Sequence, residues 1–156
     1  MKNIPLWING SAVESKSGRS GDVYDPALGE VTAQVGFANQ AEINQTIAAA
    51  AAAFPAWRDQ SLTKRIQIMF KFRELLEAKK SELAEIITAE HGKVLSDAMG
   101  EITRGQEVVE FACGMPQLLK GEYSENASTN VDVYSLKQPL GVVGICLLYT
   151  SDAADE

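Results

Sequence analysis

The spacing of apolar side chains changes along the sequence, and the first part of the chain has the pattern of short strands. Up to about residue 36, apolar residues come in short runs separated by turn signals. Asn9-Gly10 is typical of a hairpin, and the segment 25–29, Asp-Pro-Ala-Leu-Gly, is typical of a tight turn. We therefore expect a small antiparallel meander at the N-terminus.

From Asn39 the apolar residues recur every three or four positions, which predicts helices. Asn39 and Glu42 have the spacing of a capping box, so we expect a first helix to begin there. Pro55 should end or bend this helix because proline has no N–H to donate. Farther along, Ser81 is expected to cap another helix, which Gly92 closes.

A longer helix is predicted from Ser96, and three glycines interrupt its pattern. Gly100, Gly105 and Gly114 each cost about 1 kcal/mol relative to alanine inside a helix. They indicate either close backbone contact with another element or a ligand, or simply a loose helix.

Beyond Gly121 the pattern changes to a period of two, which predicts extended strands around 131–135. The run 142–145, Val-Val-Gly-Ile, is continuously apolar and has the character of a buried strand in a parallel sheet. Such a strand needs neighbours for its backbone N–H and C=O groups. Since the chain then turns polar and acidic, we expect it to be part of a larger α/β protein.

Composition excludes several classes of protein. The 156 residues include 14 basic and 21 acidic side chains, for a net charge of −7, which disfavours nucleic-acid binding. No apolar run approaches the roughly 18 residues of a membrane span, so no membrane partner is expected. The two cysteines, Cys113 and Cys146, lack the spacing of a metal or disulfide site, so no metal is expected and a cytoplasmic location fits best.

Six short motifs then occur in a fixed order. They are Ile8-Asn9-Gly10, the segment 25–31 (DPALGEV), the segment 52–57 (AAFPAW), the segment 90–93 (EHGK), the segment 100–105 (GEITRG) and the segment 138–143 (QPLGVV). Each is weak alone, but their order resembles the N-terminal part of the aldehyde dehydrogenase superfamily over residues 4–145. The segment 109–114, Val-Glu-Phe-Ala-Cys-Gly, is most similar to the CoA-acylating methylmalonate-semialdehyde dehydrogenases.

The resemblance implies an α/β fold and a division of the chain. Residues 1–145 would form part of an N-terminal cofactor-binding domain: short antiparallel strands, a helical layer, a β-extension and the first strand of a parallel sheet. Residues 121–138 would belong to the β-extension, through which such enzymes pair into homo-oligomers. Residues 146–156 no longer match the family and are expected to be a non-native tail on a truncated chain.

The resemblance also implies a reaction, in which a small carboxylated semialdehyde is oxidised with NAD, through a cysteine thioester, to an acyl-CoA. The family's nucleophilic cysteine, general-base glutamate and nicotinamide contacts lie on segments beyond this chain. No catalytic or cofactor-binding residue is therefore assigned here, and the fragment alone is expected to be inactive and without a cofactor. The alternatives are another aldehyde dehydrogenase branch that uses an uncharged aldehyde, or a non-catalytic helical interaction module.

Arg104 is the one candidate for contact with a substrate. A planar guanidinium can hold a carboxylate through two parallel hydrogen bonds, and the resemblance places a substrate-binding arginine at this position. The alternative is an ordinary surface arginine that pairs with Glu101 and Glu107, each three residues away on a helix.

The other chemically distinctive residues are expected to have structural roles. Cys113 lies in an apolar helical stretch without an activating base, and Cys146 lies in the non-matching tail. His91, the only histidine, is expected at a helix end, where a cation suits the helix dipole. Trp7 and Trp57 are expected to be core or interface anchors.

Overall fold

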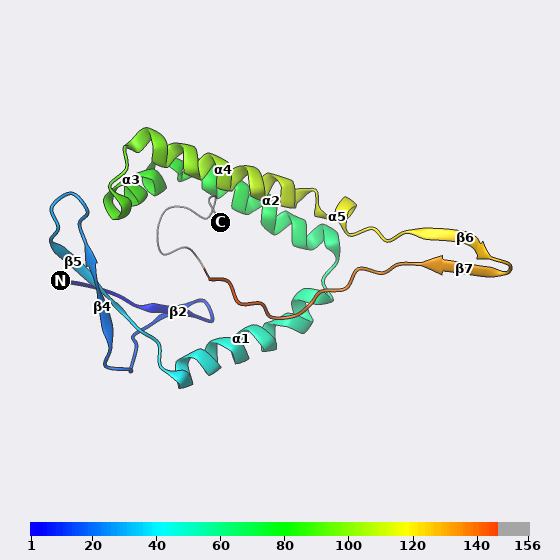
Figure 1. Cartoon of the computed structure of the whole chain (residues 1–156), viewed down its shortest axis with the longest axis horizontal. Helices are drawn as coiled ribbons and strands as arrows, with labels where there is room; N and C mark the ends of the chain where they lie inside the picture. The colour runs from blue at the N-terminus through cyan, green and yellow to red at the C-terminus, as the bar shows by residue number, and fades with distance from the viewer. Residues whose placement is uncertain (147–156) are drawn as a thin grey trace.

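The computed structural model describes residues 1–146 and has an N-terminal group of strands, a layer of helices and a projecting hairpin (Figure 1). In chain order the elements are β1 (Lys2–Ile4), β2 (Leu6–Ile8), β3 (Ser11–Val13), β4 (Ser20–Tyr24), β5 (Val31–Gly36), α1 (Gln40–Arg58), α2 (Leu62–Ala78), α3 (Lys80–His91), α4 (Leu95–Cys113), α5 (Met115–Leu118), β6 (Tyr123–Ser128) and β7 (Val131–Tyr134). The mixture of strands and helices agrees with the expected α/β class.

The N-terminal strands do not form one antiparallel meander, so that prediction was wrong. β2 and β3 pair as a hairpin through Asn9 and Gly10, both with positive φ, and β4 pairs antiparallel with β5 as expected. However, β1 lies parallel to β5, with Asn3 opposite Gln34. A period of two along a strand does not reveal the direction of its neighbour. The long connection between β1 and β5 permits the parallel arrangement.

The capping box at the start of α1 is confirmed, and its glutamate also binds the loop that contains Ser15 and Lys16. The side chain of Asn39 accepts a hydrogen bond from the Glu42 N–H at 2.9 Å, and the Glu42 carboxylate accepts one from the Asn39 N–H at 2.8 Å. The same buried carboxylate accepts hydrogen bonds from the Lys16 N–H at 2.7 Å and from the Ser15 hydroxyl at 3.2 Å. These hydrogen bonds, led by those from the two backbone N–H groups, lower the pKa of Glu42.

Pro55 does not end α1, because the helix continues to Arg58. The carbonyl of Pro55 accepts a hydrogen bond from the Asp59 N–H at 3.0 Å, which completes the last turn. The carbonyl that proline leaves without an intrahelical donor belongs to Ala51, which is exposed, so water can satisfy it.

The prediction that Ser81 caps a helix was also wrong. α2 and α3 are separated only by Lys79, which ends one helix and precedes the next without a side-chain cap. Ser81 therefore lies inside the first turn of α3. Gly92 closes α3 as predicted, with φ of 81°.

A small cluster of buried apolar side chains lies between α3 and α4, while Ile8 and Ala33 are buried among the N-terminal strands. Ala84 and Ala98 are fully buried, and Ile102 packs beside them. Small side chains at this contact let the two helices approach closely. α2 packs along α4 on another side, and the two run beside each other in Figure 1.

The predicted long helix is divided at Gly114 into α4 and the short α5. A Cβ atom added to Gly100 or Gly105 would meet nothing within 4 Å. The close contact that these glycines indicated is therefore not made by the described residues.

The run 142–145 is not a strand, and it is exposed rather than buried. Among residues 1–146 no strand pairs with this run. An extended segment becomes a strand only when a neighbouring strand accepts its backbone hydrogen bonds. The remainder of the expected tail, residues 147–156, lies outside the described residues.

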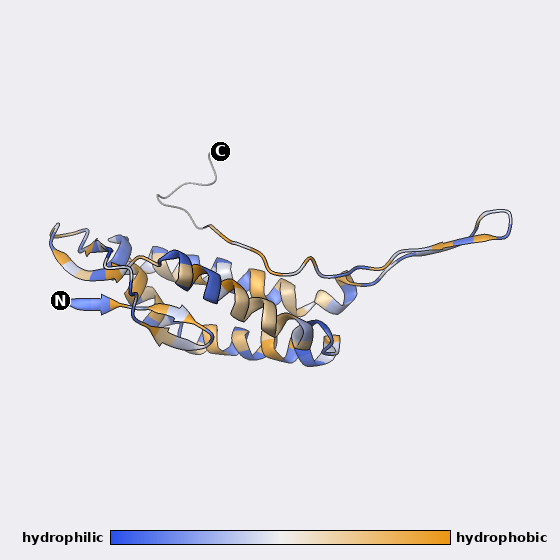
Figure 2. Ribbon diagram, turned by 90° about the horizontal axis from the view of Figure 1, so that it is seen from below, coloured by the Kyte–Doolittle hydropathy of each residue, from blue (hydrophilic) through white to orange (hydrophobic). Residues whose placement is uncertain are grey.

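Much apolar surface is exposed along the helices. Figure 2 shows hydrophobic stretches on the helices and on the segment that follows β7. On α1 the exposed side chains include Ile43 and Ile47, and on α2 they include Ile68, Phe72 and Leu75. The hairpin of β6 and β7 extends away from the helical layer, and every residue in it is exposed.

Glu42 should give the start of α1 a pH dependence. The pKa of Glu42 is lowered in the folded chain, so its contribution to stability is complete above the ordinary value of 4.5 and is lost as the pH falls through the lower, folded pKa. The protection factors of the amides of residues 42–44, which are corrected for the intrinsic pH dependence of exchange, should fall over this range. Glu42→Gln should already exchange faster at pH 7 and depend less on pH, whereas Glu85→Gln, on an exposed part of α3, should behave as the unsubstituted chain does.

Gly105→Ala should stabilise α4. The added methyl group meets no neighbour, and alanine is favoured over glycine in a helix by about 1 kcal/mol. Urea unfolding followed by circular dichroism should show this gain. Gly92→Ala, at a residue with positive φ, should instead lower stability, and a loss of stability in Gly105→Ala would mean that another element occupies the space beside α4.

Candidate functional site

The turn between α3 and α4 has a fixed backbone. The N–H of Gly92 donates to the Thr88 carbonyl at 2.8 Å, and the carbonyl of Val94 accepts from the Asp97 and Ala98 N–H groups at 3.1 Å, which starts α4. A Cβ atom at Gly92 would lie only 3.0 Å from Cγ of Pro26. The turn at 25–29 therefore rests directly against this junction, and both the positive φ and the contact require glycine.

Lys93, the next residue, makes the main ion pair of the site. Its Nζ donates to Oε1 of Glu101, on the second turn of α4. The Lys93 side chain is 19% exposed and the Glu101 side chain 43% exposed, so the lysine is the more enclosed partner. The hydrogen bond from Lys93 is the largest cause that lowers the pKa of Glu101. His91 and Arg104 add smaller electrostatic contributions, and partial desolvation opposes them.

Arg104 lies one turn after Glu101 on α4 and is exposed. Within residues 1–146, no hydrogen bond or ion pair is formed by its guanidinium. Neither Glu101, which is bound by Lys93, nor Glu107 forms an ion pair with Arg104 within residues 1–146. Arg104 therefore presents an uncommitted positive charge.

The helical face that carries Arg104 combines acidic residues (Asp97, Glu101 and Glu107) with exposed apolar side chains. Val108 and Phe111 follow at spacings of four and three residues, and both are 69% exposed. The buried side chains of α4 (Ala98, Ile102 and Gln106) lie on its other side. A guanidinium beside an apolar stripe is suited to a small molecule that has a carboxylate at one end and a less polar group at the other.

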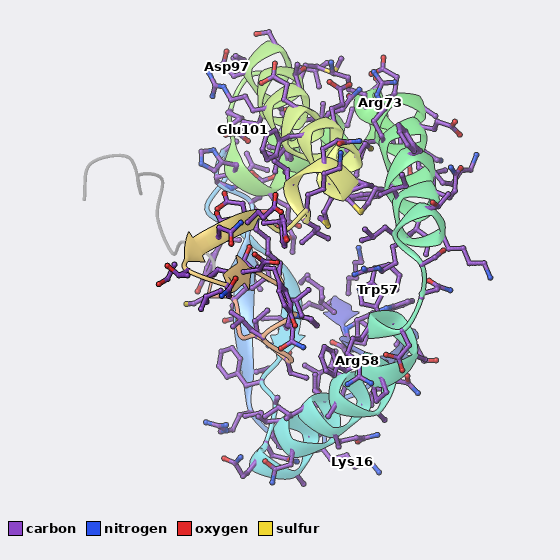
Figure 3. The ribbon with its side chains drawn as sticks, turned by 90° about the vertical axis from the view of Figure 1, so that its right-hand side faces the viewer. Lys16, Trp57, Arg58, Arg73, Asp97 and Glu101 are labelled. Atoms are coloured by element: carbon purple, nitrogen blue, oxygen red, sulfur yellow. The ribbon has the colours of Figure 1, made fainter. Side chains whose placement is uncertain are left out.

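A second ion pair ties α4 to α2 some distance from Arg104. Nε of Arg73 donates to Oε1 of Glu110 at 2.8 Å. Figure 3 shows Arg73 on α2, apart from Asp97 and Glu101 on α4. This pair holds two helices together and leaves Arg73 no free charge for a ligand.

The structure places the other candidate residues as follows. His91 is the last residue of α3, as predicted, and is exposed. Cys113 ends α4 and is half-buried, while Cys146 is exposed. Trp7 and Trp57 are exposed and are therefore not core residues of the described chain, so only the interface role remains as a prediction.

Lys93 is the residue that sequence reasoning missed. Its partner is eight positions away across a turn, a spacing that no helical or strand period connects. The only available signal was its place directly after Gly92, which predicted a sharp reversal of the chain.

Three surface hollows occur among residues 1–146. One of about 490 Å³ is lined by a single face of α2, and another of about 290 Å³ lies between β2 and α1 and is mostly apolar. A third, of about 210 Å³, lies among the N-terminal strands, and its lining includes both Glu14 and Arg19. None of these three combines a helix N-terminus with a glycine-rich turn, the arrangement that commonly holds a dinucleotide phosphate.

No helix within residues 1–146 is both long enough and apolar enough to cross a membrane. No group of three or more histidine, cysteine or acidic side chains in that range is arranged to hold a metal ion.

Comparison with known proteins points to one family. The aldehyde dehydrogenase family model matches residues 12–148. A malonate-semialdehyde dehydrogenase of Pseudomonas aeruginosa is 47% identical over 143 residues, which are 92% of this chain and 29% of the relative. A mitochondrial acylating methylmalonate-semialdehyde dehydrogenase of Arabidopsis thaliana is 47% identical over 144 residues, 92% of this chain and 24% of that protein.

Solved structures agree with these sequence matches. A methylmalonate-semialdehyde dehydrogenase from Sinorhizobium meliloti 1021, in complex with NAD, superposes with a TM-score of 0.86 at 40% identity, over 90% of this chain and 29% of that one. The corresponding enzyme from Oceanimonas doudoroffii gives 0.85 at 46% identity, over 90% and 28%. The chain thus spans less than a third of the length of these relatives, and it belongs to the aldehyde dehydrogenase family.

Proposed function

We propose that this chain is the N-terminal segment of an NAD-dependent, CoA-acylating malonate- or methylmalonate-semialdehyde dehydrogenase. The observation that carries the proposal is the guanidinium of Arg104, which forms no ion pair among the described residues and lies on an exposed helical face beside Val108 and Phe111. The relatives named above act, by their descriptions, on semialdehydes that carry a carboxylate, and such substrates need a cation to orient them.

Arg104 has the chemistry for this role. A guanidinium presents two parallel N–H donors to a carboxylate, and this fixes the direction of the substrate as well as its position. With the carboxylate held at one end, the aldehyde carbon at the other end has a defined distance from the site of attack. Orientation of this kind accelerates a reaction because it removes the entropy cost of alignment.

The reacting groups themselves are assigned to other segments. In the complete enzyme, NAD would supply the hydride acceptor for oxidation of the aldehyde, and CoA would be the co-substrate that receives the acyl group. The residues of this chain contribute orientation of the substrate, and neither Cys113 nor Cys146 is assigned the nucleophilic role.

We further propose that the hairpin of β6 and β7 within residues 121–138 pairs subunits into a homo-oligomer. Its complete exposure and its extension away from the helices support this assignment. A cytoplasmic location is proposed from the sequence, whose two cysteines are 33 positions apart and lack disulfide-type spacing.

Arg104→Leu tests the substrate class in the complete enzyme that contains this segment. Loss of hydrogen bonds between charged groups should raise KM for the carboxylated semialdehyde about tenfold to a hundredfold. KM for an uncharged aldehyde of similar length should change little. Arg104→Lys should fall between, since it keeps the charge but not the two parallel donors.

Lys64→Met is the matched control, because it removes an exposed positive charge from α2. It should alter neither KM. An equal effect of Arg104→Leu on both aldehydes would favour the branch that uses uncharged substrates.

The exposed apolar faces distinguish an enzyme segment from an independent helical module. The 156-residue chain should bind a hydrophobic dye more strongly than a compact monomer of its size, because its exposed apolar side chains lie in contiguous groups. Phe72→Ser, which removes an exposed ring from α2, should reduce the dye signal. A cooperative thermal transition without dye binding would support the interaction module instead.

A further inference from the structure

Whether the Arg104 guanidinium stays unpaired depends on the acidic side chains next to it on α4. Glu101 lies three residues before Arg104, a spacing at which opposite charges on a helix attract each other. Glu107 lies three residues after it. An acidic residue that precedes its basic partner along a helix pairs better than one that follows it, so Glu101 is the better placed of the two to occupy the guanidinium and to compete with an incoming substrate.

Lys93 prevents this competition. It reaches Glu101 from the turn before α4, and among the described residues it is the only side chain that forms an ion pair with that carboxylate. The lysine is the more enclosed partner, and its backbone follows Gly92, whose φ and contact with Pro26 fix the turn. The carboxylate is therefore held by a cation whose position is set by the fold.

The remaining charged residues near Glu101 interact with its carboxylate more weakly than Lys93 does. His91 and Arg104 each influence the carboxylate electrostatically, but neither forms a hydrogen bond or an ion pair with it. Asp97, one turn earlier on α4, brings a second negative charge to the same end of the helix (Figure 3). Removal of the lysine would leave Glu101 facing Arg104 and His91 alone.

We propose that Lys93 is a positioning residue for substrate specificity, an inference that rests on the proposed function. By binding Glu101 it keeps this carboxylate from Arg104, and so leaves the guanidinium available to the carboxylate of the substrate. Lys93 itself does not contact the substrate.

Lys93→Met in the complete enzyme tests the proposal. KM for the carboxylated semialdehyde should rise about two- to fivefold, the range over which an exposed ion pair shifts an equilibrium, while kcat stays nearly constant. KM for an uncharged aldehyde should stay nearly unchanged. Lys93→Arg keeps a cation at this place and should restore the original KM.

The double variant Lys93→Met/Glu101→Gln is the decisive comparison. If Lys93 acts through Glu101, neutralising the glutamate should return KM close to its original value, and Glu101→Gln alone should leave KM unchanged or slightly lower. If the double variant keeps the raised KM, Lys93 acts by another route and the proposal is wrong.

The 156-residue chain gives an independent readout by nuclear magnetic resonance. Lys93→Met should slow exchange of the Arg104 Nε proton with water, because a new hydrogen bond to Glu101 protects it. Unchanged exchange would overturn the proposal even if Arg104→Leu behaves as expected. Conversely, an equal effect of Arg104→Leu on both aldehydes would refute the proposed substrate class and leave the ion-pair result standing.

Discussion

The arrangement of the site depends on the left-handed backbone of Gly92. This one residue ends α3, turns the chain toward α4 and allows Pro26 to approach within ordinary packing distance of the turn. The reversal brings Ala84 and Ala98 into contact and sets the position of Lys93. A side chain at Gly92 would strain the backbone and displace the 25–29 turn, so the helical layer and the ion pair of the site share a single geometric requirement.

As a result of this arrangement, the Arg104 guanidinium remains without an ion-pair partner although the Glu101 carboxylate lies one turn away. Arg104 and Glu101 have the spacing of a helical ion pair, yet Glu101 is bound by Lys93 from the preceding turn. The charge of the glutamate is compensated by a residue that the fold holds in place, whereas the arginine lies on the exposed face. Selective binding of an anion requires such a free cation, since a guanidinium already paired within the protein would have to break that pair first.

Local signals in the sequence predicted local structure well. The capping box of Asn39 and Glu42, the Asn9-Gly10 hairpin and the end of α3 at Gly92 follow from nearest neighbours along the chain, and all are confirmed. The parallel pairing of β1 and the Lys93–Glu101 ion pair were not predictable, because they join residues that only the folded backbone brings together. The run 142–145 illustrates the same limit, since its apolar pattern indicated a strand that the described residues give no partner.

The exposed apolar faces and the charge of Arg104 are physically linked. In water an ion pair between exposed groups contributes little, because solvent screens both charges. The apolar side chains beside Arg104 on its face, Val108 and Phe111, would exclude water once another surface covered them. The same guanidinium would then bind a carboxylate in a less polar environment, where the attraction is much stronger. Covering the face of α4 would therefore do more than stabilise the helix, because it would turn an ordinary surface arginine into a selective one.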